Sequence, residues 1–532
     1  MANFVWWKHG VVYQIYPRSF QDTDGDGVGD LKGISERLEY LEWLGVDAIW
    51  ISPIYPSPMA DFGYDVSDYC SIDPLLGSLE EFDRLVAAAH ARKIKVILDF
   101  VPNHTSERHP WFLESRASRI NPKRDWYIWR DGGPDGSPPN NWLSQFGGPA
   151  WTREARTGQY YLHSFLPEQP DLNWRNPAVR TAMYDVLRFW LDRGVDGFRV
   201  DVIWLLIKDA ALRDNPPNPN SRPNEAGIHR FMQVYSADQP ETHEVVAEMR
   251  FVLDQYDERV LIGEIYLPIE RLVTYYGQDL RGAQLPFNFQ LLHTAWTAAG
   301  VGKPVTDDYE GALPPGGWPN WVLGNHDQPR IAARVGEAQA RVAAMLLLTL
   351  RGTPTMYYGD ELGIGRVAIP HEAVKDAWEK NEPGLGLGRD PSRTPFQWDA
   401  TSNAGFSSGT PWLPVDPSFK SHNVKVLRAD PASILSLYRD LLSIRRKHPA
   451  LVSGTFRLQG TEGNALVFER KAESERIIVC LNFGDTEQPL PVEDFGRSVI
   501  LASTHPDRAS LDPKTVLRPN EGLTILTTAL PS

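Results

Sequence analysis

The chain has 532 residues, of which 42% are hydrophobic and 23% charged, a composition typical of a globular protein. The length suits one large domain and one or two smaller ones, at roughly 100 to 200 residues per domain. No apolar run approaches the roughly 20 residues that a membrane-spanning helix needs, so we expect no membrane anchor. The formal net charge of -14 argues against a nucleic-acid partner, because binding to phosphates requires a basic surface.

Cysteine usage and the N-terminus indicate a reducing compartment. Cys70 and Cys480 are far apart in apolar surroundings, which favours buried free thiols over a disulfide framework. Residues 1–10 lack the apolar stretch and cleavage site of a secretory signal, so we expect the mature chain to begin at or near Met1. We therefore expect a cytoplasmic location, and export by another bacterial route stays open.

Strand-like and helix-like segments alternate up to about residue 450. We predict strands at residues 11–16, 47–52, 95–100, 194–201, 260–264, 285–289, 321–325 and 354–358, with helices at 34–44, 79–91 and 178–192 among others. This alternation is typical of a parallel sheet with helical crossovers. Eight such strands predict a closed (β/α)8 TIM barrel of the α/β class.

Two segments fall outside this alternation. Residues 104–176 are rich in Pro, Gly, Asn and Trp, with short strands such as 159–163, and are predicted to be a subdomain inserted after the third strand. After a helix at 434–447, alternating strands at 455–459, 465–470, 476–482, 498–502 and 523–527 predict a C-terminal antiparallel β-sandwich. We therefore divide the chain into a barrel (1–103 and 177–450), an inserted subdomain (104–176) and a C-terminal domain (451–532).

The predicted strand at 194–201 ends with two charged residues, Arg199 and Asp201. Positions two apart on a strand point the same way, so these side chains can meet. We expect the guanidinium to keep the Asp201 carboxylate ionised at neutral pH. Taken alone, the pair is explained equally well as a structural ion pair at a strand end.

Other polar residues also stand at strand ends: Glu264, His104, His326 and Asp327. The carboxyl ends of barrel strands meet at one mouth, so three carboxylates, two histidines and an arginine are expected to gather there. Cleavage of a glycosidic bond needs two carboxyl groups, one ionised and one protonated. Asp201 fits the anion, and Glu264, after an apolar strand, fits a carboxyl with a raised pKa.

Four short motifs carry these residues: DFVPNH at 99–104, GFRVD at 197–201, GEIY at 263–266 and NHDQ at 325–328. Longer segments accompany them, namely VVYQIYPRSFQDTDGDGVGDLKGI, DFGYDVSDY, QPDLNW, GTPTMYYGDELG and RTPFQWD. In order and spacing they resemble glycoside hydrolase family 13, the α-amylase superfamily, over almost the whole chain. The chain looks closer to the α-glucosidase and oligo-1,6-glucosidase branch than to the endo-acting amylases.

The resemblance implies a retaining mechanism with Asp201 as nucleophile, Glu264 as general acid and base, and Asp327 as stabiliser of the transition state. It further implies that a pocket for the non-reducing-end glucose is formed by Asp61, Tyr64, His104, Phe146, Phe165, Arg199, His326 and Arg393. Asp61 and Arg393 would hold the outer hydroxyls of that sugar and close the pocket. We therefore expect an exo-acting α-glucosidase for short oligosaccharides or disaccharides, without an organic cofactor and with its oligomeric state open.

Val202 directly follows the predicted nucleophile. In related enzymes a valine here tends to accompany cleavage of α-1,6 bonds, whereas alanine, glycine or threonine tends to accompany α-1,4 preference. We therefore favour isomaltose-type substrates, with maltose and other α-glucosides left open. The loop at 215–224 could form the rim of the aglycone site and override this single side chain.

The acidic run at residues 22–30 resembles part of an EF-hand loop, with acids at positions 1, 3, 5 and 9, glycine at 6 and a carbonyl at 7. Position 12 is Gly33 rather than glutamate. The resemblance implies a structural Ca²⁺ or Mg²⁺ ion held by Asp22, Asp24, Asp26, the Val28 carbonyl and Asp30. The alternative is a solvated acidic turn.

Two other functions are weighed against hydrolysis. A covalent glucosyl intermediate can pass to a sugar instead of water, so an α-glucosyl transferase or isomerase of the trehalose or isomaltulose type stays open. A non-catalytic binding or transporter-associated relative is disfavoured, because all three acids are present. A comparison of free glucose with new disaccharides among the products separates the first two.

Overall fold

The computed structural model describes residues 4–473, 475–490, 497–508, 510–511 and 516–528. The expected start of the mature chain at Met1 lies outside these ranges, as does part of the predicted C-terminal domain. No helix in the described ranges is long and apolar enough to cross a membrane.

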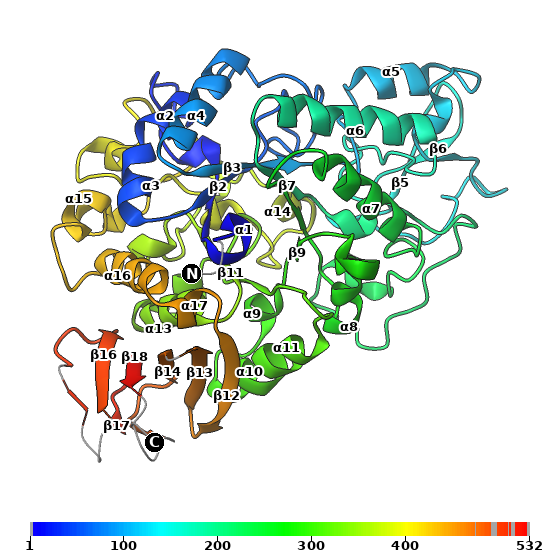
Figure 1. Cartoon of the computed structure of the whole chain (residues 1–532). Coiled ribbons are helices and arrows are strands. Elements are labelled where there is room, and N and C mark those ends of the chain that lie inside the picture. Colours follow the sequence, from blue (N-terminus) through cyan, green and yellow to red (C-terminus); the bar gives the residue numbers. More distant parts are fainter. Residues whose placement is uncertain (1–3, 474, 491–496, 509, 512–515, 529–532) are drawn as a thin grey trace.

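Eight parallel strands form the central sheet, which confirms the predicted (β/α)8 barrel (Figure 1). They neighbour one another in the order β10-β11-β1-β2-β3-β7-β8-β9. Each overlaps a predicted segment. Their bounds are β1 (Val12–Ile15), β2 (Ala48–Ile51), β3 (Lys95–Phe100), β7 (Gly197–Val200), β8 (Val260–Gly263), β9 (Leu285–Pro286), β10 (Asn320–Val322) and β11 (Thr353–Tyr357).

A single asparagine bridges the gap between β9 and β10. Among the described residues, backbone pairing runs from β10 round to β9 but does not join these two strands. Asn320 on β10 accepts the amide of Asn288 at 2.9 Å and donates its side-chain N–H to the Pro286 carbonyl on β9. The side chain of Asn320 thus satisfies buried backbone groups that a ladder would otherwise pair.

The helices around the barrel follow from amphipathic spacing and caps. In α4 the buried residues Phe82, Leu85 and Val86 recur on one face, and Ser78 caps its first turn by accepting the amide of Glu81. The predicted helix at 34–44 is two helices, since the backbone leaves helical geometry at Arg37 (ψ 4°). The helices interleaved with the strands are α2 (Leu31–Glu36), α3 (Leu38–Leu44), α4 (Leu79–Ala91), α6 (Pro177–Asp192), α7 (Thr242–Leu253) and α13 (Glu337–Thr349).

Shorter helices and the last long helix complete the described chain. They are α1 (Trp6–His9), α5 (Pro110–Ala117), α8 (Ile269–Leu272), α9 (Gln290–His293), α10 (Ala298–Val301), α11 (Asp308–Ala312), α12 (Ile331–Val335), α14 (Ala377–Asn381), α15 (Val424–Leu427), α16 (Ile434–Lys447) and α17 (Pro449–Val452). Many of the shortest ones lie in the connections that follow barrel strands, where side chains for a site are supplied.

The segment between β3 and α6 carries a small antiparallel sheet, in the order β4-β6-β5. Its strands are β4 (Trp129–Arg130), β5 (Trp151–Arg153) and β6 (Tyr160–Leu162). In Figure 1 this cyan segment lies at one side of the barrel, beyond α6. It is the place where the insertion is predicted, although the domain bounds themselves remain a prediction.

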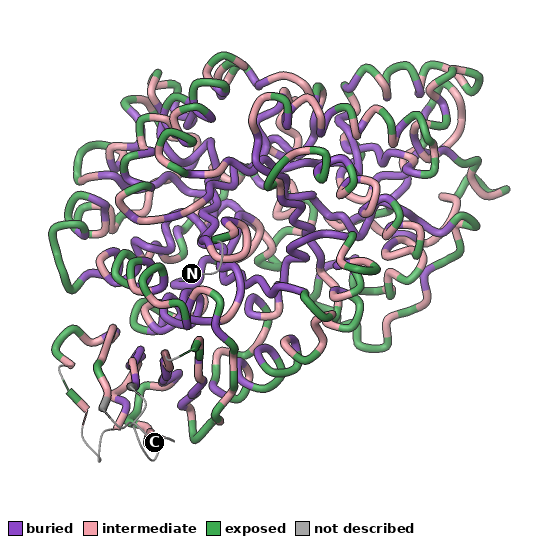
Figure 2. The backbone as a smooth tube through the Cα atoms, viewed as in Figure 1, coloured by how far each residue is buried: buried purple, intermediate pink, exposed green. Residues whose placement is uncertain are grey.

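The C-terminal residues form a five-stranded antiparallel sheet in the order β12-β13-β14-β18-β16, which confirms the predicted β domain. The strands are β12 (Thr455–Glu462), β13 (Ala465–Ala472), β14 (Glu475–Asn482), β16 (Arg497–Ser503) and β18 (Gly522–Thr528), with the short pair β15 (Gln488–Pro489) and β17 (Val516–Leu517) beside them. The sheet packs against α13 and α17, at the opposite corner from the insertion (Figure 1). Figure 2 shows buried backbone concentrated in the barrel and a mixture of buried and exposed residues in this sheet.

Candidate active site

A cavity of about 340 Å³ opens at the carboxyl ends of the barrel strands. Ten predicted site residues line it: Asp61, Tyr64, His104, Phe146, Phe165, Asp201, Val202, Glu264, His326 and Asp327. They come from loops after β2, β3, β7, β8 and β10 and from the inserted segment, so the strand ends converge as barrel geometry predicts. Arg199 and Arg393 lie behind the lining residues.

Arg199 on β7 is the electrostatic centre of this site. Its Nη1 lies 2.8 Å from an oxygen of Asp99 and 2.7 Å from one of Asp201, and its Nη2 lies 2.7 Å from Glu264. Asp99 and Arg199 are register partners on adjacent strands, which fixes the first contact. The side chain of Arg199 is fully buried, so all three contacts are shielded from water.

One guanidinium therefore serves three buried carboxylates. Burial raises the pKa of Asp201, and Arg199 offsets only part of this effect because Glu264 and Asp99 act against it. Burial likewise raises the pKa of Glu264, as predicted, and that of Asp99 to about 6. Arg199 contacts Asp201 as predicted, but it shares its single charge with Glu264 and Asp99, so the ionisation of Asp201 remains a prediction of the sequence.

The backbone after Asp201 orients the second acid. Val202 adopts a left-handed conformation (φ 37°, ψ 45°), which is rare for a β-branched residue. In this conformation its amide donates to Oε2 of Glu264 at 2.8 Å. Arg199 also contacts Oε2, so Oε1 is the oxygen of Glu264 that can present a proton to the cavity.

Asp327 has several positive neighbours, in contrast to the three carboxylates that share Arg199. Burial alone would raise its pKa, but His326, Arg389 and Arg393 lower it below its ordinary range. Arg393 lies 2.9 Å and Arg389 3.2 Å from one carboxylate oxygen, and His326 lies 3.2 Å from the other. Asp327 is therefore the carboxylate of the site that stays ionised over the working range of pH.

His104, Tyr64 and Asp61 form a connected group on another wall. Nε2 of His104 lies 3.0 Å from the Tyr64 carbonyl and 3.1 Å from the amide of Gln169, which also lies 3.3 Å from Asp61. Burial lowers the pKa of His104 to about 4, so the ring is neutral. The Tyr64 ring stacks on that of His326 with centroids 5.1 Å apart, which fixes both rings against the cavity.

Arg389, which the sequence analysis missed, occupies the position expected of Arg393. Its guanidinium lies 2.7 Å from Asp61, 3.2 Å from Asp327 and 2.6 Å from Asp376, and it lines the cavity. Arg393 instead donates to the His326 carbonyl and to Asp327 from behind. The two arginines are four positions apart across a short turn, so the sequence offered no periodicity to choose between them.

Further lining residues were also missed, and most lie on long loops. They are Gln145, Trp204, Leu205, Ile228, His229, Gln233, Tyr266, His293, Gln328, Trp378 and Arg389. Two signals pointed to some of them: Tyr266 and Gln328 end the motifs at 263–266 and 325–328, and Ile228, His229 and Gln233 lie just beyond the loop at 215–224 that was predicted to border the aglycone site.

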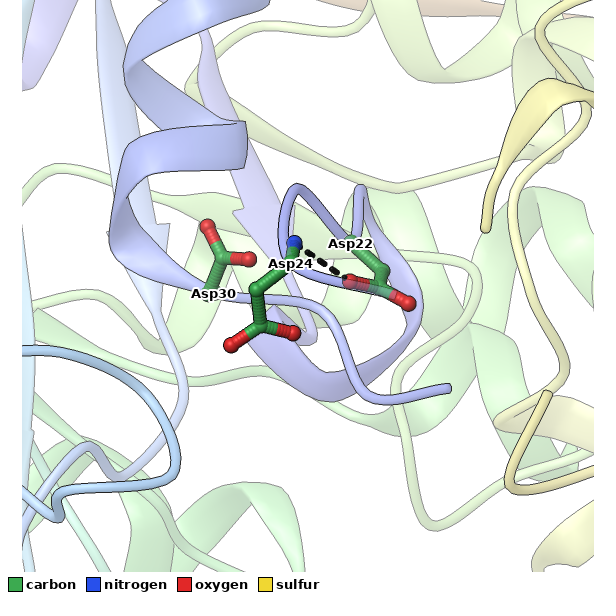
Figure 3. Close-up of side chains that lie close together, drawn as sticks. All are labelled: Asp22, Asp24 and Asp30. Atoms are coloured by element: carbon green, nitrogen blue, oxygen red, sulfur yellow. Dashed lines mark hydrogen bonds between the residues drawn. The ribbon is translucent and has the colours of Figure 1, made fainter. Parts of the chain in front are cut away.

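The acidic loop after β1 brings three of its carboxylates together (Figure 3). Oxygens of Asp22, Asp24 and Asp30 all lie within 4.8 Å of one another, and oxygen donors are those that Ca²⁺ and Mg²⁺ prefer. Asp26 lies outside this group, and its carboxylate accepts the amide of Val28 at 2.7 Å. The three clustered carboxylates therefore fit a hard cation, and the part of Asp26 in such a site remains a prediction.

Buried carboxyl groups around a basic centre, at the mouth of a (β/α)8 barrel, define an enzyme of the glycoside hydrolase class. Residues 14–454 match the family model described as "Alpha amylase, catalytic domain". The chain belongs to the α-amylase family, as its motifs predicted. The predictions of a glycoside hydrolase of the α-glucosidase class and of its fold are confirmed.

Relatives and solved structures agree with this assignment. The chain is 43% identical over 496 residues to a probable alpha-glucosidase of Rhizobium meliloti, with 90% of each chain covered. It is 40% identical over 521 residues to an oligo-1,6-glucosidase of Parageobacillus thermoglucosidasius, covering 90% of this chain and 91% of the other. Among solved structures, an alpha-glucosyl transfer enzyme, XgtA, superposes with a TM-score of 0.93 at 40% identity, covering 99% of this chain and 100% of the other. The trehalulose synthase MutB of Pseudomonas mesoacidophila superposes with a TM-score of 0.89 at 36% identity, with 99% and 100% covered.

Proposed function

We propose that the protein is an exo-acting, retaining α-glucosidase that releases α-glucose from the non-reducing end of short α-glucosides. One observation carries this proposal: Asp201 and Glu264 bind the two ends of one guanidinium and line one cavity. Retention needs two carboxyl groups about 5–5.5 Å apart, whereas inversion needs about 6.5–9.5 Å to admit a water between them. Two carboxyl groups that share one guanidinium suit the shorter spacing.

The reaction proceeds by double displacement. Asp201 attacks the anomeric carbon and forms a covalent glucosyl ester, while Glu264 transfers its proton to the departing glycosidic oxygen. Glu264, now ionised, then takes a proton from water, whose oxygen attacks the same carbon and regenerates Asp201. Asp327 stays ionised and stabilises the positive charge that develops at the anomeric centre in both steps.

The pocket for the terminal sugar accounts for exo action. Asp61, His104 and Arg389 supply polar atoms to its wall, and Phe146 and Phe165 supply aromatic ones. The Asp61–Arg389 ion pair, at 2.7 Å, closes the wall between the β2 loop and the β11 loop. A pocket closed in this way admits the end of a chain and not its middle.

Val202 favours α-1,6 bonds over α-1,4 bonds in our proposal. It lines the cavity next to Asp201, where the aglycone has to pass, and an oligo-1,6-glucosidase is among the relatives. The alternative, an α-glucosyl transferase or isomerase, draws support from structural similarity to a glucosyl transfer enzyme and a trehalulose synthase.

We also propose that the loop at 22–30 holds a structural Ca²⁺ or Mg²⁺ ion through Asp22, Asp24 and Asp30, with Asp26 and the Val28 carbonyl completing the set. The domain division, the cytoplasmic location and the absence of nucleic-acid and membrane partners remain predictions of the sequence.

Product analysis tests the function. We expect isomaltose to give glucose alone, maltotetraose to give glucose and maltotriose first, and proton NMR of the earliest product to show the α-anomer. Maltose, trehalose and sucrose complete the panel. Release of the β-anomer would exclude retention, internal cleavage of maltotetraose would exclude exo action, and dominant new disaccharides would establish the transferase or isomerase.

A further inference from the structure

Three loops that are far apart in the sequence form the outer wall of the cavity. Phe146 comes from the inserted segment, Ile228 and His229 from the connection after β7, and Trp378 from α14 after β11. The rings of Phe146 and Trp378 pack together with centroids 5.5 Å apart. None of these residues lies on a barrel strand, so the wall depends on contacts that the loops make with one another.

Glu382, just after α14, contacts all three loops. Its Oε1 accepts the amide of Gly227 at 2.8 Å, and its Oε2 accepts the indole N–H of Trp378 at 3.2 Å. A Cβ placed on Gly147 would lie 2.7 Å from Cγ of Glu382, so this side chain also lies against the backbone of the inserted loop. A carboxylate that accepts from two neutral donors makes charge-assisted hydrogen bonds, which are stronger than neutral ones.

We propose that Glu382 is a positioning residue that clamps these three loops and thereby limits the aglycone to about one sugar unit. The inference rests on the proposed α-glucosidase function and specifies its chain-length preference. Gly227 directly precedes Ile228 and His229, so the clamp fixes both side chains over the cavity. The cavity, at about 340 Å³, lies near the lower end of the roughly 300–1,000 Å³ range of ligand pockets, which suits a disaccharide.

The clamp also reaches the pocket for the terminal sugar. Trp378 packs on Phe146, and the guanidinium of Arg389 lies 4.6 Å from the centre of the Phe146 ring. Arg389 in turn contacts Asp61. These contacts connect Glu382 to the inner wall through one aromatic pair. Loss of the Glu382 side chain is therefore expected to open the outer wall first.

The test compares Glu382→Ala and Glu382→Gln with a matched control, Glu379→Ala. Glu379 lies on α14, three positions before Glu382, and among the described residues its side chain accepts the amides of Gly384 and Gly388 at 3.2 and 3.1 Å, both within its own loop. We expect Glu382→Ala to raise the ratio of kcat/KM for isomaltotriose over isomaltose by roughly tenfold, the size of one lost charge-assisted hydrogen bond. Glu382→Gln keeps an acceptor for Gly227 and should fall between wild type and alanine. Glu379→Ala should leave the ratio unchanged.

Hydrogen exchange gives a readout that does not need turnover. The amides of residues 227–230 should exchange faster in Glu382→Gln and Glu382→Ala than in wild type, and at the wild-type rate in Glu379→Ala. An unchanged ratio together with unchanged exchange would overturn the clamp, as would an equal change in Glu379→Ala. If wild type cleaves no α-glucoside at all, the proposed function fails, whereas the exchange experiment still decides the clamp.

Discussion

Strand β7 carries a cluster of buried charges at each end, and the two clusters have opposite balances. Before its first residue, Asp196 is surrounded by three basic side chains, with His90 at 2.6 Å, Lys95 at 3.1 Å and Arg259 at 3.3 Å. Burial of Asp196 would raise its pKa, but the hydrogen bond from His90, the amide of Val96 and the nearby Lys95 lower it. The Asp196 carboxylate is therefore fully paired, so we assign this cluster a structural role.

At the carboxyl end of the same strand the ratio is reversed, since within the described part of the chain Arg199 is the one cation in contact with Asp99, Asp201 and Glu264. Too few positive partners leave these carboxyl groups with raised pKa values, which suits Glu264 as the proton donor, while the contact with Arg199 favours the ionised form of Asp201 that nucleophilic attack requires. The ratio of cations to carboxylates, rather than burial or pairing alone, therefore distinguishes the structural end of this strand from the reactive one.

The largest effect is expected from Asp201→Asn. It removes the nucleophile and one of three crowded carboxylates, so kcat on a nitrophenyl α-glucoside should fall by at least about 10⁴-fold. The unfolding temperature should stay equal or rise, because a like-charged neighbour is lost. Retained turnover in this variant would remove Asp201 from its proposed role.

Asp196→Asn should lower stability and leave turnover unchanged, so it is the control for Asp201→Asn. We expect the free energy of unfolding to fall by about 2 kcal/mol, less than the ~3–5 kcal/mol for a fully buried pair, because the three basic side chains reach solvent. Turnover at a permissive temperature should be that of wild type. Denaturant unfolding compares it with Asp185→Asn, an exposed change on α6 that should cost less than about 0.5 kcal/mol.

The free energy of unfolding should change with pH in opposite directions for the carboxyl groups at the two ends of β7. Asp99 has a folded pKa of about 6 against an ordinary value of 3.8, so the stability that it contributes is present below pH 3.8 and is lost as the pH rises to about 6. Asp196 has a lowered pKa, so its contribution is present above pH 3.8 and is lost as the pH falls further. Unfolding of wild type, Asp99→Asn and Asp196→Asn from pH 3 to 7 isolates each group, and parallel curves for the two variants would contradict the contrast.

The sequence predicted the barrel and the meeting of its strand-end carboxylates because both follow from regular periodicity, whereas the roles of those carboxylates were implied by the family resemblance. Strand alternation placed Arg199 and Asp201 on one side, and the convergence of strand ends brought Glu264 and Asp327 to them. Neither the partnership of Asp99 with Arg199 nor the resulting charge ratio was predicted, since both depend on the register between adjacent strands.

The remaining site residues that the sequence did not predict lie on loops. Arg389 and Arg393 flank a 3₁₀ turn in the loop after β11, and only the folded path of that turn decides which one reaches Asp61. The contacts of Glu382 join three loops of unrelated sequence, so no local pattern could have indicated them. Residue patterns alone thus predicted side chains on strands and at strand ends, whereas individual loop residues such as Phe146 and Phe165 were predicted only through the family resemblance.

The smallest expected effect is on the preference between α-1,6 and α-1,4 bonds. It tests whether the carboxyl end of β7 determines linkage specificity as well as reactivity. Val202 is buried, and its backbone amide donates to Glu264 while the residue lines the cavity. Val202→Ala keeps the amide and removes two methyl groups, so the ratio of kcat/KM for isomaltose over maltose should fall by about tenfold. Turnover of a nitrophenyl α-glucoside should change less, because the contact with Glu264 persists. If the ratio stays within about twofold of wild type, linkage is decided by the loops of the outer wall, and the charge cluster at the end of β7 governs reactivity alone.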